Sequence, residues 1–367
     1  MVGGFLGAGK TTLLFEATKR LMENGQRIGL ITNDQAPELV DTAFLLQTKV
    51  KVAEVSGSCF CCNYNGFISS LQQVKAEAQA DIVIAEPVGS CTDLSATMMQ
   101  PLKEHMNADL QLSPLTVLAD PSRLTDILEG GTAGLNPSAA YIFRKQLEEA
   151  DIILVTKTDL LKPEEIALLK EKAKLHFPAS EVMSVSSKTG EGVDEWIKKV
   201  LESNNSGQRI VEVDYDRYAE GEAVLGWLNS TISLKGEQIN WDNFARDFLS
   251  ELGKKIDHLQ LGVGHIKIML EAGTNYLVGN LTGKSDTLSL RGLAGISNEA
   301  QIIINARVGA SPQLLEQIVS ETLESAAKNS ITLTTKASQC ISPGYPTPTY
   351  RYDKIAGKLM KNKHIDT

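Results

Sequence analysis

The first 200 residues alternate short apolar runs with longer stretches in which apolar residues recur at helical spacing. The short runs are rich in Val and Ile and nearly continuous in apolarity, as expected of strands buried on both faces of a sheet. The pattern predicts strands at 27–33, 50–55, 81–85, 115–119, 151–156 and 181–185. It predicts helices at 10–24, 66–78, 92–106, 141–150, 163–176 and 192–203. This alternation favours an α/β fold with a doubly wound, mostly parallel sheet.

The pattern changes after the polar break Ser203-Asn204-Asn205-Ser206-Gly207, which predicts a domain boundary. Beyond it we expect strands at 223–234, 265–270, 276–281, 300–306 and 331–335, and helices at 240–255 and 312–328. These elements favour a smaller α+β domain, with a ferredoxin-like layer as its candidate form. We therefore expect a first domain at 1–207, a second at 208–345 and a mobile tail at 346–367, where prolines alternate with polar residues.

A complete phosphate-binding loop opens the first predicted helix and reads Gly4-Phe5-Leu6-Gly7-Ala8-Gly9-Lys10-Thr11. Its glycines let backbone N–H groups surround phosphates, and the helix N-terminus adds its positive end. Lys10 would bridge the β and γ phosphates, and the Thr11 hydroxyl would hold Mg²⁺. The alternative is a chance Gly-rich turn. The predicted phosphate-binding residues are Gly4, Gly7, Ala8, Gly9, Lys10, Thr11 and Thr12.

Only Met1, Val2 and Gly3 precede this loop, whereas such loops normally follow a full buried strand. We expect either a start codon placed too late or a trimmed chain. The alternative is a protein with a weakened central strand.

Two more predicted strands end on acidic residues. Glu86-Pro87-Val88-Gly89 follows the strand at 81–85, where the acid can reach the Mg²⁺ shell or an attacking water and the Gly89 N–H can face the γ-phosphate. Alone this motif is weak, because a strand that ends in an acid and a turn is ordinary. Asp34 would approach Mg²⁺ at the start of a switch loop at 35–41, with an Asx-turn at Asn33-Asp34 as the alternative. We predict catalytic roles for Lys10, Glu86 and Asp34.

The strand at 151–156 ends in Thr156-Lys157-Thr158-Asp159, which suits a guanine site. A carboxylate at Asp159 can accept both the N1–H and the N2 amino hydrogens of guanine, a pair of donors that adenine lacks. The Lys157 stem would pack over the base. The alternative is a helix cap, in which Thr158 or Asp159 begins the helix at 163–176. The loop Ser186-Ser187-Lys188-Thr189-Gly190 resembles one that lays a backbone N–H against the guanine oxygen, so Ser187 and Lys188 join the predicted nucleotide contacts.

Three of the five cysteines stand together in Cys59-Phe60-Cys61-Cys62, after the strand at 50–55. A turn at the flanking Gly57 and Asn63 could bring all three sulfurs together, and three thiolates suit Zn²⁺ as well as cobalt or nickel. The fourth position would be open to water, a partner's ligand, Glu86 or Cys91. Inert core cysteines are one alternative. A redox dithiol is another, although adjacent cysteines form only strained disulfides.

The phosphate loop, the Cys-x-Cys-Cys triplet, the Glu-x-x-Gly turn and the Lys-x-Asp motif together resemble the CobW-type GTPases, relatives of the nickel-handling UreG and HypB proteins. The resemblance covers about residues 3–200. It implies a slow GTPase that binds a divalent metal at Cys59, Cys61 and Cys62 and hands it to a client, or acts as a chaperone for a metal or corrinoid enzyme. The chain departs from the pattern at Thr156, where most GTPases have Asn and a supporting hydrogen bond.

Composition narrows the function classes. A net charge of −9 argues against broad nucleic-acid binding, and no apolar run is long enough to span a bilayer. Five cysteines, an odd count with two of them adjacent, are a poor disulfide framework and fit a cytoplasmic protein. We expect a GTP-hydrolysing, metal-coupled switch with Mg²⁺ and Zn²⁺ (or Co²⁺ or Ni²⁺), which binds GTP or GDP and an unknown client; a homodimer is left open.

The sequence leaves two rival functions open. One is a P-loop kinase with structural cysteines, which would require a phosphoacceptor and show no guanine preference. The other is a regulatory protein for a corrinoid or metal enzyme that transfers no metal.

Overall fold

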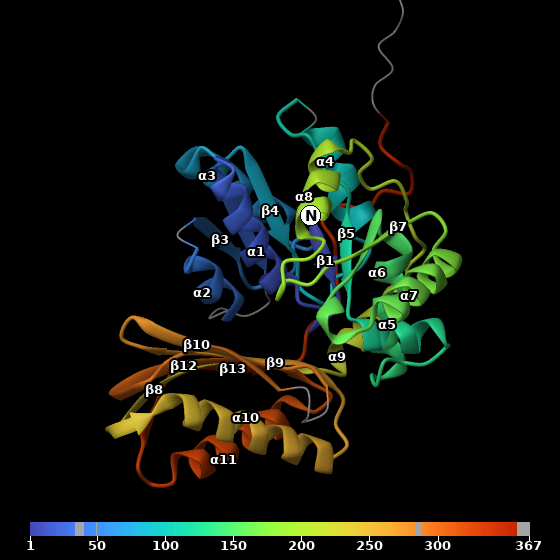
Figure 1. Ribbon diagram of the computed structural model, residues 1–367. Coiled ribbons are helices and arrows are strands. Elements are labelled where there is room, and N and C mark those ends of the chain that lie inside the picture. The colour runs from blue at the N-terminus through green and yellow to red at the C-terminus, as the bar shows by residue number, and fades with distance from the viewer. Residues whose placement is uncertain (34–39, 49, 107, 284–287, 358–367) are drawn as a thin grey trace, which may run out of the picture.

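The computed structural model describes residues 1–33, 40–48, 50–106, 108–283 and 288–357. Asp34 and most of the predicted switch loop therefore lie outside the described residues, and their roles stay predictions. The molecule has two layers (Figure 1). The N-terminal half builds a layer of mixed helices and strands, and the C-terminal part builds a sheet with two helices. In the described residues, no helix is long and apolar enough to cross a membrane.

Parallel strands and surrounding helices form the first layer, which confirms the predicted α/β class. Hydrogen-bonded ladders give two parallel sheets, ordered β1-β5-β6-β7 and β3-β2-β4. The strands are β1 (Val2–Gly4), β2 (Ile28–Asn33), β3 (Lys51–Val55), β4 (Ile82–Glu86), β5 (Thr116–Ala119), β6 (Ile152–Val155) and β7 (Glu181–Ser184). The helices are α1 (Lys10–Glu23), α2 (Val40–Leu46), α3 (Tyr64–Ala78), α4 (Gln100–His105), α5 (Pro121–Leu128), α6 (Pro137–Glu149), α7 (Pro163–His176) and α8 (Val193–Glu202).

The strand in front of the phosphate loop is present and short. The three residues of β1 pair in parallel with β5, with Gly3 opposite Val117. β1 also lies beside β4, but within the described residues no hydrogen-bonded ladder joins the two. The boundary between the two parallel sheets therefore falls next to the phosphate loop.

Four helical segments differ from the sequence expectation. The predicted helix at 92–106 begins with a π-helical turn, Ser95–Met99, before α4. α2, α5 and α9 (Tyr215–Ala223) were not predicted, because they are short or polar and owe their place to packing. α5 did carry a signal, since Asp120 caps it and Pro121 occupies its first turn.

The second layer is an antiparallel sheet of six strands ordered β11-β10-β9-β12-β8-β13. Four neighbouring strands of this sheet, β13-β8-β12-β9, form a ferredoxin-like unit with α10 and α11. Along the chain, α10 follows β8 and α11 follows β12, which gives the β-α-β-β-α-β order of that fold. The β10–β11 hairpin extends that sheet at the β9 edge. The elements are β8 (Gly226–Asn240), α10 (Trp241–His258), β9 (Val263–Ala272), β10 (Asn275–Leu281), β11 (Ser289–Leu293), β12 (Ile296–Val308), α11 (Pro312–Ala327) and β13 (Thr332–Ile341).

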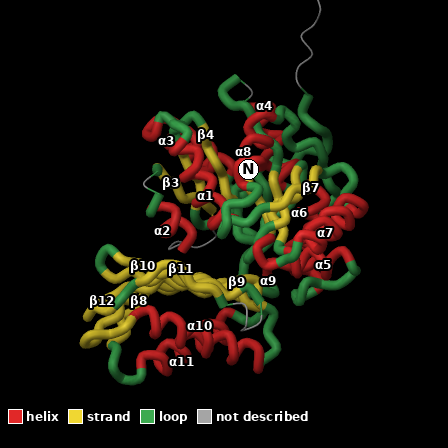
Figure 2. Tube along the Cα trace, in the orientation of Figure 1, coloured by secondary structure: helices red, strands yellow, loops and turns green. Residues whose placement is uncertain are grey.

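The antiparallel sheet lies between its own helices and the first layer (Figure 2). α10 and α11 cover one face, where the large buried cluster of this domain forms. α2 packs on the opposite face, where Phe44 joins Met269 and Val278 in a small buried cluster. The predicted boundary at 207 stays a prediction; α9, which follows it, packs against α6 of the first layer.

The C-terminal residues run back over the first layer instead of continuing the second. Arg351 forms an ion pair with Asp93 at 2.7 Å, and the Tyr352 N–H donates to the Ala96 carbonyl at 3.1 Å. The mobility expected for 346–367 stays a prediction, but the described part of this segment makes specific contacts.

Candidate nucleotide and metal sites

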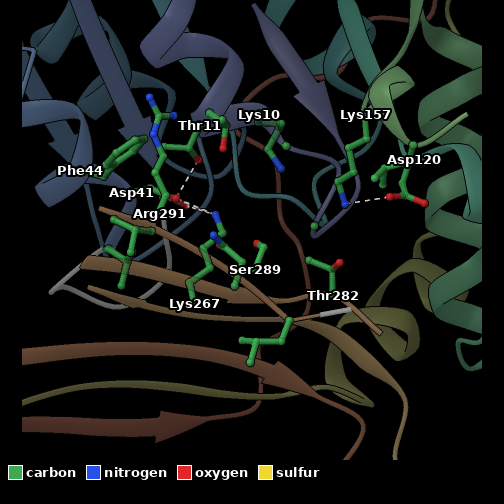
Figure 3. Close-up of a pocket in the computed structure, with 18 of the residues that line it drawn as sticks. Lys10, Thr11, Asp41, Phe44, Asp120, Lys157, Lys267, Thr282, Ser289 and Arg291 are labelled. Atoms are coloured by element: carbon green, nitrogen blue, oxygen red, sulfur yellow. Dashed lines mark hydrogen bonds and ion pairs between the residues drawn. The ribbon is translucent and has the colours of Figure 1, made fainter. Parts of the chain in front are cut away.

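The phosphate loop leads from β1 into α1 and borders a cleft of about 560 Å³ between the two layers (Figure 3). Gly9 caps α1 in the left-handed conformation, with a φ of 90°. Gly7 also has a positive φ, and a Cβ there would lie 2.9 Å from the Thr282 side chain of the second domain. Glycine is therefore required at Gly7 by conformation and by the close approach of the second layer.

Lys10 is buried at the base of this loop. Its ammonium donates to the Gly4 carbonyl at 2.9 Å. Burial lowers the pKa of Lys10, and the nearby Glu86 carboxylate opposes that shift. Gly89 is close by, since a Cβ there would lie 3.0 Å from the Lys10 ammonium. The structure thus brings Lys10 and the Glu86–Gly89 turn together.

Two carboxylates converge on the Thr11 hydroxyl. It is 2.7 Å from Asp41 Oδ1 and 3.1 Å from Glu86 Oε1. Burial raises the pKa of Glu86 to about 7, and the Asp41 charge adds to the shift. Burial also acts to raise the pKa of Asp41, but the Lys267 ammonium outweighs it and the pKa of Asp41 is lowered.

Of the predicted base-binding residues, Lys157 belongs to the wall of the cleft, and Asp159, Ser187 and Lys188 do not. Lys157 lines the cleft and forms an ion pair with Asp120 at 2.8 Å. The Asp159 carboxylate accepts a hydrogen bond from the Ser186 hydroxyl at 2.7 Å, and the Lys188 ammonium lies 3.7 Å from it. Ser187, between them in sequence, is half-buried. The capping alternative is not observed, because α7 is capped at Lys162.

Thr156, the departure from the usual Asn, has its own structural role. Its hydroxyl donates to the Ala8 carbonyl at 2.8 Å and also approaches the Ala119 carbonyl at 3.3 Å. The side chain therefore joins the end of β6 directly to the phosphate loop. Thr is shorter than the Asn of most GTPases, and at this position it supports the phosphate loop through its hydroxyl donor.

Six of the predicted nucleotide residues line the cleft, and the others lie behind or beside it. Those in the wall are Gly7, Gly9, Lys10, Thr11, Thr12 and Lys157. The sequence did not indicate the opposite wall, which the second domain supplies. Its polar members are Lys267, Asn280, Thr282, Ser289 and Arg291. No local motif marks these residues, because only the packing of the two layers brings them to the phosphate loop.

The cysteine motif folds as a tight turn in front of α3. Its metal-binding atoms are the sulfurs of Cys59, Cys61 and Cys62, which all lie within 4.8 Å of one another. The Cys59 sulfur is 3.0 Å from each of the other two, which are 3.8 Å apart. The Asn63 side chain caps α3 at the end of the turn. The predicted convergence of three thiols is confirmed.

The surroundings of one of these thiols, Cys59, favour the thiolate form. Hydrogen bonds from Cys61 and Cys62 hold the pKa of Cys59 well below its usual value. The Cys91 thiol also acts to lower the pKa of Cys59, and Cys91 is buried in the same apolar cluster as Cys59 and Cys61. The pKa of Cys62, which is half-exposed, is raised to about 11 by its hydrogen bond with Cys59. All five cysteines are free.

Two features relate the cysteine turn to the Glu86–Gly89 turn. The first is Asn33, which follows Thr32, the register partner of Glu86 on β4. At the end of β2, the Asn33 amide donates to Val55 and Ser58 carbonyls at 2.7 and 2.8 Å. Its oxygen accepts from the Phe60 N–H at 2.8 Å. Cys91 makes the second connection, because it follows Gly89 by two residues.

The C-terminal segment covers the outer side of this cysteine turn. The Thr349 N–H donates to the Cys61 carbonyl at 2.7 Å, and the Thr349 hydroxyl approaches the Cys62 carbonyl at 3.2 Å. Tyr350 packs edge-on against Tyr64, with ring centroids 5.1 Å apart. Sequence reasoning missed this contact, since nothing in a proline-containing tail indicates its docking site.

Comparison with known proteins identifies the first domain. The family described as "CobW/HypB/UreG, nucleotide-binding domain" matches residues 1–183. The "Zinc chaperone CobW" of Pseudomonas aeruginosa is 25% identical over 221 residues, which cover 52% of this chain and 56% of that protein. The "Zinc chaperone CobW" of a Sinorhizobium species is 27% identical over 219 residues, 52% of this chain and 59% of that protein. The match thus spans little more than half of each relative.

Among solved structures, the hydrogenase maturation factor HypB from Archaeoglobus fulgidus is 20% identical, with a TM-score of 0.39. It covers 56% of this chain and 88% of its own. The family match coincides with the domain that holds the phosphate loop and the cysteine turn. Through that domain, the chain belongs to the CobW/HypB/UreG family.

Proposed function

We propose that this protein is a GTP-hydrolysing metallochaperone that couples its nucleotide state to a divalent metal held by Cys59, Cys61 and Cys62. The observation that carries the proposal is the closeness of the cysteine turn to the Glu86–Gly89 turn. Asn33 binds the cysteine turn and follows Thr32, the register partner of Glu86. Cys91 follows Gly89 by two residues and is buried with Cys59 and Cys61. A movement of the Glu86–Gly89 turn on γ-phosphate binding would reach Cys91 within two residues. The names of the curated relatives, which are zinc chaperones, support the choice of cargo.

GTP would occupy the cleft with its phosphates on the glycine-rich loop. The cleft volume of about 560 Å³ is within the range of small-molecule sites. Lys10 would exchange the Gly4 carbonyl for the β and γ phosphates. At the other end, Asp159 would read the two hydrogen-bond donors of guanine, and the Lys157 stem would cover the base.

The residues around Thr11 fit Mg²⁺. Glu86 Oε2 is buried and has no hydrogen-bond partner within the described part of the chain, and Glu86 Oε1 and Asp41 Oδ1 already meet at the Thr11 hydroxyl. Hard oxygen ligands of this kind are those that Mg²⁺ prefers. When bound, Mg²⁺ would neutralise phosphate charge. Lys10 and the Gly89 N–H would stabilise charge on the γ-phosphate, and Glu86 would orient the attacking water.

Zn²⁺ would bind the three converging sulfurs as cargo, with Co²⁺ or Ni²⁺ as alternatives of the same ligand preference. The Cys59 thiolate is the first ligand, and metal binding would deprotonate the other two. Three protein ligands leave a fourth position, which allows the metal to be passed to a ligand of a client metalloprotein or corrinoid protein. Cys62 is the most exposed of the three cysteines, so a client would approach the metal from the side of Cys62.

Zinc affinity measured with GTP, with GDP and without nucleotide tests this proposal. We expect one tightly bound Zn²⁺ per chain and a difference between the GTP and GDP states of about 5- to 150-fold, the usual range for coupled sites. Cys61→Ala should lose the tight site. Cys340→Ala is the matched control, because Cys340 lies in the second domain on β13 and donates to the Pro312 carbonyl.

The outcomes separate the parts of the proposal. Equal zinc affinity in all three nucleotide states would rule out coupling. Tight zinc binding that survives in Cys61→Ala would rule out this metal site. A protein that turns over GTP only when a phosphoacceptor is added would be a kinase instead.

A further inference from the structure

The wall of the cleft that faces Thr11 carries a cation from the other domain. Lys267, on β9 of the antiparallel sheet, reaches across the cleft to Asp41 on α2 (Figure 3). Its ammonium lies 2.6 Å from both carboxylate oxygens of Asp41. The two side chains are only 15% and 21% exposed, so water weakens this ion pair less than it would at the surface.

Asp41 accepts hydrogen bonds from two partners at once. The oxygen Oδ1 that contacts Lys267 is also the acceptor of the Thr11 hydroxyl at 2.7 Å. Thr11 in turn contacts Glu86. The Lys267 ammonium is thus adjacent to the oxygen atoms that fit Mg²⁺.

A metal ion and the Lys267 ammonium would compete for the Asp41 carboxylate. Mg²⁺ binds oxygen at about 2.0–2.1 Å, so an ion on Asp41 Oδ1 would lie less than about 5 Å from a lysine still paired with that oxygen. Two cations at that distance in a half-buried cleft repel each other strongly. One carboxylate therefore cannot keep Lys267 and gain Mg²⁺ without cost.

The second domain is also bound to α2 by contacts close to this ion pair. The Val40 N–H donates to the Asn305 side chain of β12 at 2.7 Å. Arg291 of β11 lies over the rings of Phe44 and Phe15, 5.5 and 4.9 Å from their centroids. A change in the partner of Asp41 would therefore act directly on the interface between the two domains.

We propose that Lys267 takes the place of Mg²⁺ in the nucleotide-free protein, and that Mg²⁺ entering with the nucleotide displaces it from Asp41. The second domain thereby senses whether the site holds a metal–nucleotide complex. This inference rests on the proposed nucleotide site and adds a residue of the second domain to its metal response. A reduced contact between β9 and α2 is the expected consequence of metal–nucleotide binding.

Binding of Mn²⁺, a paramagnetic substitute for Mg²⁺, tests the competition without nucleotide. We would measure Mn²⁺ affinity by electron paramagnetic resonance for the full chain and for Lys267→Met. If Lys267 is paired with Asp41 about 90% of the time, the apparent affinity is reduced about tenfold, and the variant regains that factor. Lys235→Met is the matched control, because it removes an exposed second-domain lysine paired with Glu299.

Two further variants make the result specific. Asp41→Asn added to Lys267→Met should abolish the gain, which assigns the bound ion to this site. Lys267→Gln keeps a polar side chain of similar size and should show the same gain if Lys267→Met does not fold. Unchanged or weaker Mn²⁺ binding in folded Lys267→Met or Lys267→Gln would overturn the inference.

A second measurement distinguishes this inference from the proposed function. The Mn²⁺ concentration needed for GTP binding should fall about tenfold in Lys267→Met relative to the unaltered chain and Lys235→Met. Failure of the unaltered chain to bind GTP at any Mn²⁺ concentration would refute the proposed function. The nucleotide-free measurement would still decide the role of Lys267.

Discussion

Arg123 is the buried cation that connects the phosphate loop to the second domain. Its guanidinium donates to the Leu6 carbonyl at 3.0 Å and to the Val263 and Gly264 carbonyls at 2.7 and 3.1 Å. The residue is only 7% exposed. A longer bond reaches the Thr282 carbonyl at 3.4 Å. Arg123→Met keeps much of the apolar stem and removes every donor, so four carbonyl oxygens at the domain junction would lose this partner.

The expected decrease in the free energy of unfolding of Arg123→Met follows from these contacts. A hydrogen bond to a charged group contributes about 1.5–3 kcal/mol net, so the three shorter bonds would contribute at most about 4.5–9 kcal/mol if their effects simply added. Burial opposes the charged form and lowers the pKa of Arg123, which shows that the desolvation is substantial. Removing one member of such a buried charged network costs about 3–5 kcal/mol. We expect that loss in the free energy of unfolding.

Urea unfolding followed by tryptophan fluorescence measures the effect. Trp196 in the first domain and Trp241 in the second are both buried, so the signal reports on both. Arg27→Met is the control, since Arg27 forms an exposed ion pair with Asp81, and its loss should destabilise the protein much less than Arg123→Met does. Arg123→Lys should lie between the two, because one ammonium replaces a planar fork. A loss below about 1 kcal/mol in Arg123→Met would refute the reasoning.

Two other predictions concern the base site and a buried acid. Asp159→Asn should weaken GTP binding about 100-fold through the loss of charge-assisted hydrogen bonds and favour xanthine nucleotides, as measured by nucleotide titration; unchanged GTP binding would show that Asp159 does not contact the base. Burial raises the pKa of Glu149 to about 8, so the folded state binds an extra proton between about pH 4.5 and 8 and stability should fall as the pH rises through this window, by as much as about 5 kcal/mol. Urea unfolding at pH 5.5 and 8.5 should show a smaller fall for Glu149→Gln, and equal falls would contradict the assignment.

The local motifs were readable from the sequence because their chemistry depends on neighbours along the chain. The phosphate loop needs glycines, Lys10 and Thr11 in one turn, and the metal site needs three cysteines within four positions. Apolar runs buried on both faces predicted the parallel strands, and the layer type of the second domain followed from its order of strands and helices. These features require only short-range geometry.

Long-range packing decided the rest. Lys267 stands 226 positions from Asp41 and Thr349 stands 287 from Cys62, so no local pattern could relate them. Both contacts form because each of the two domains buries its own apolar surface and the C-terminal segment returns over the first domain. The sequence by itself determined a nucleotide loop and a three-thiol turn. Only the tertiary structure placed a second-domain lysine on Asp41, beside Thr11, and the C-terminal segment over the cysteines.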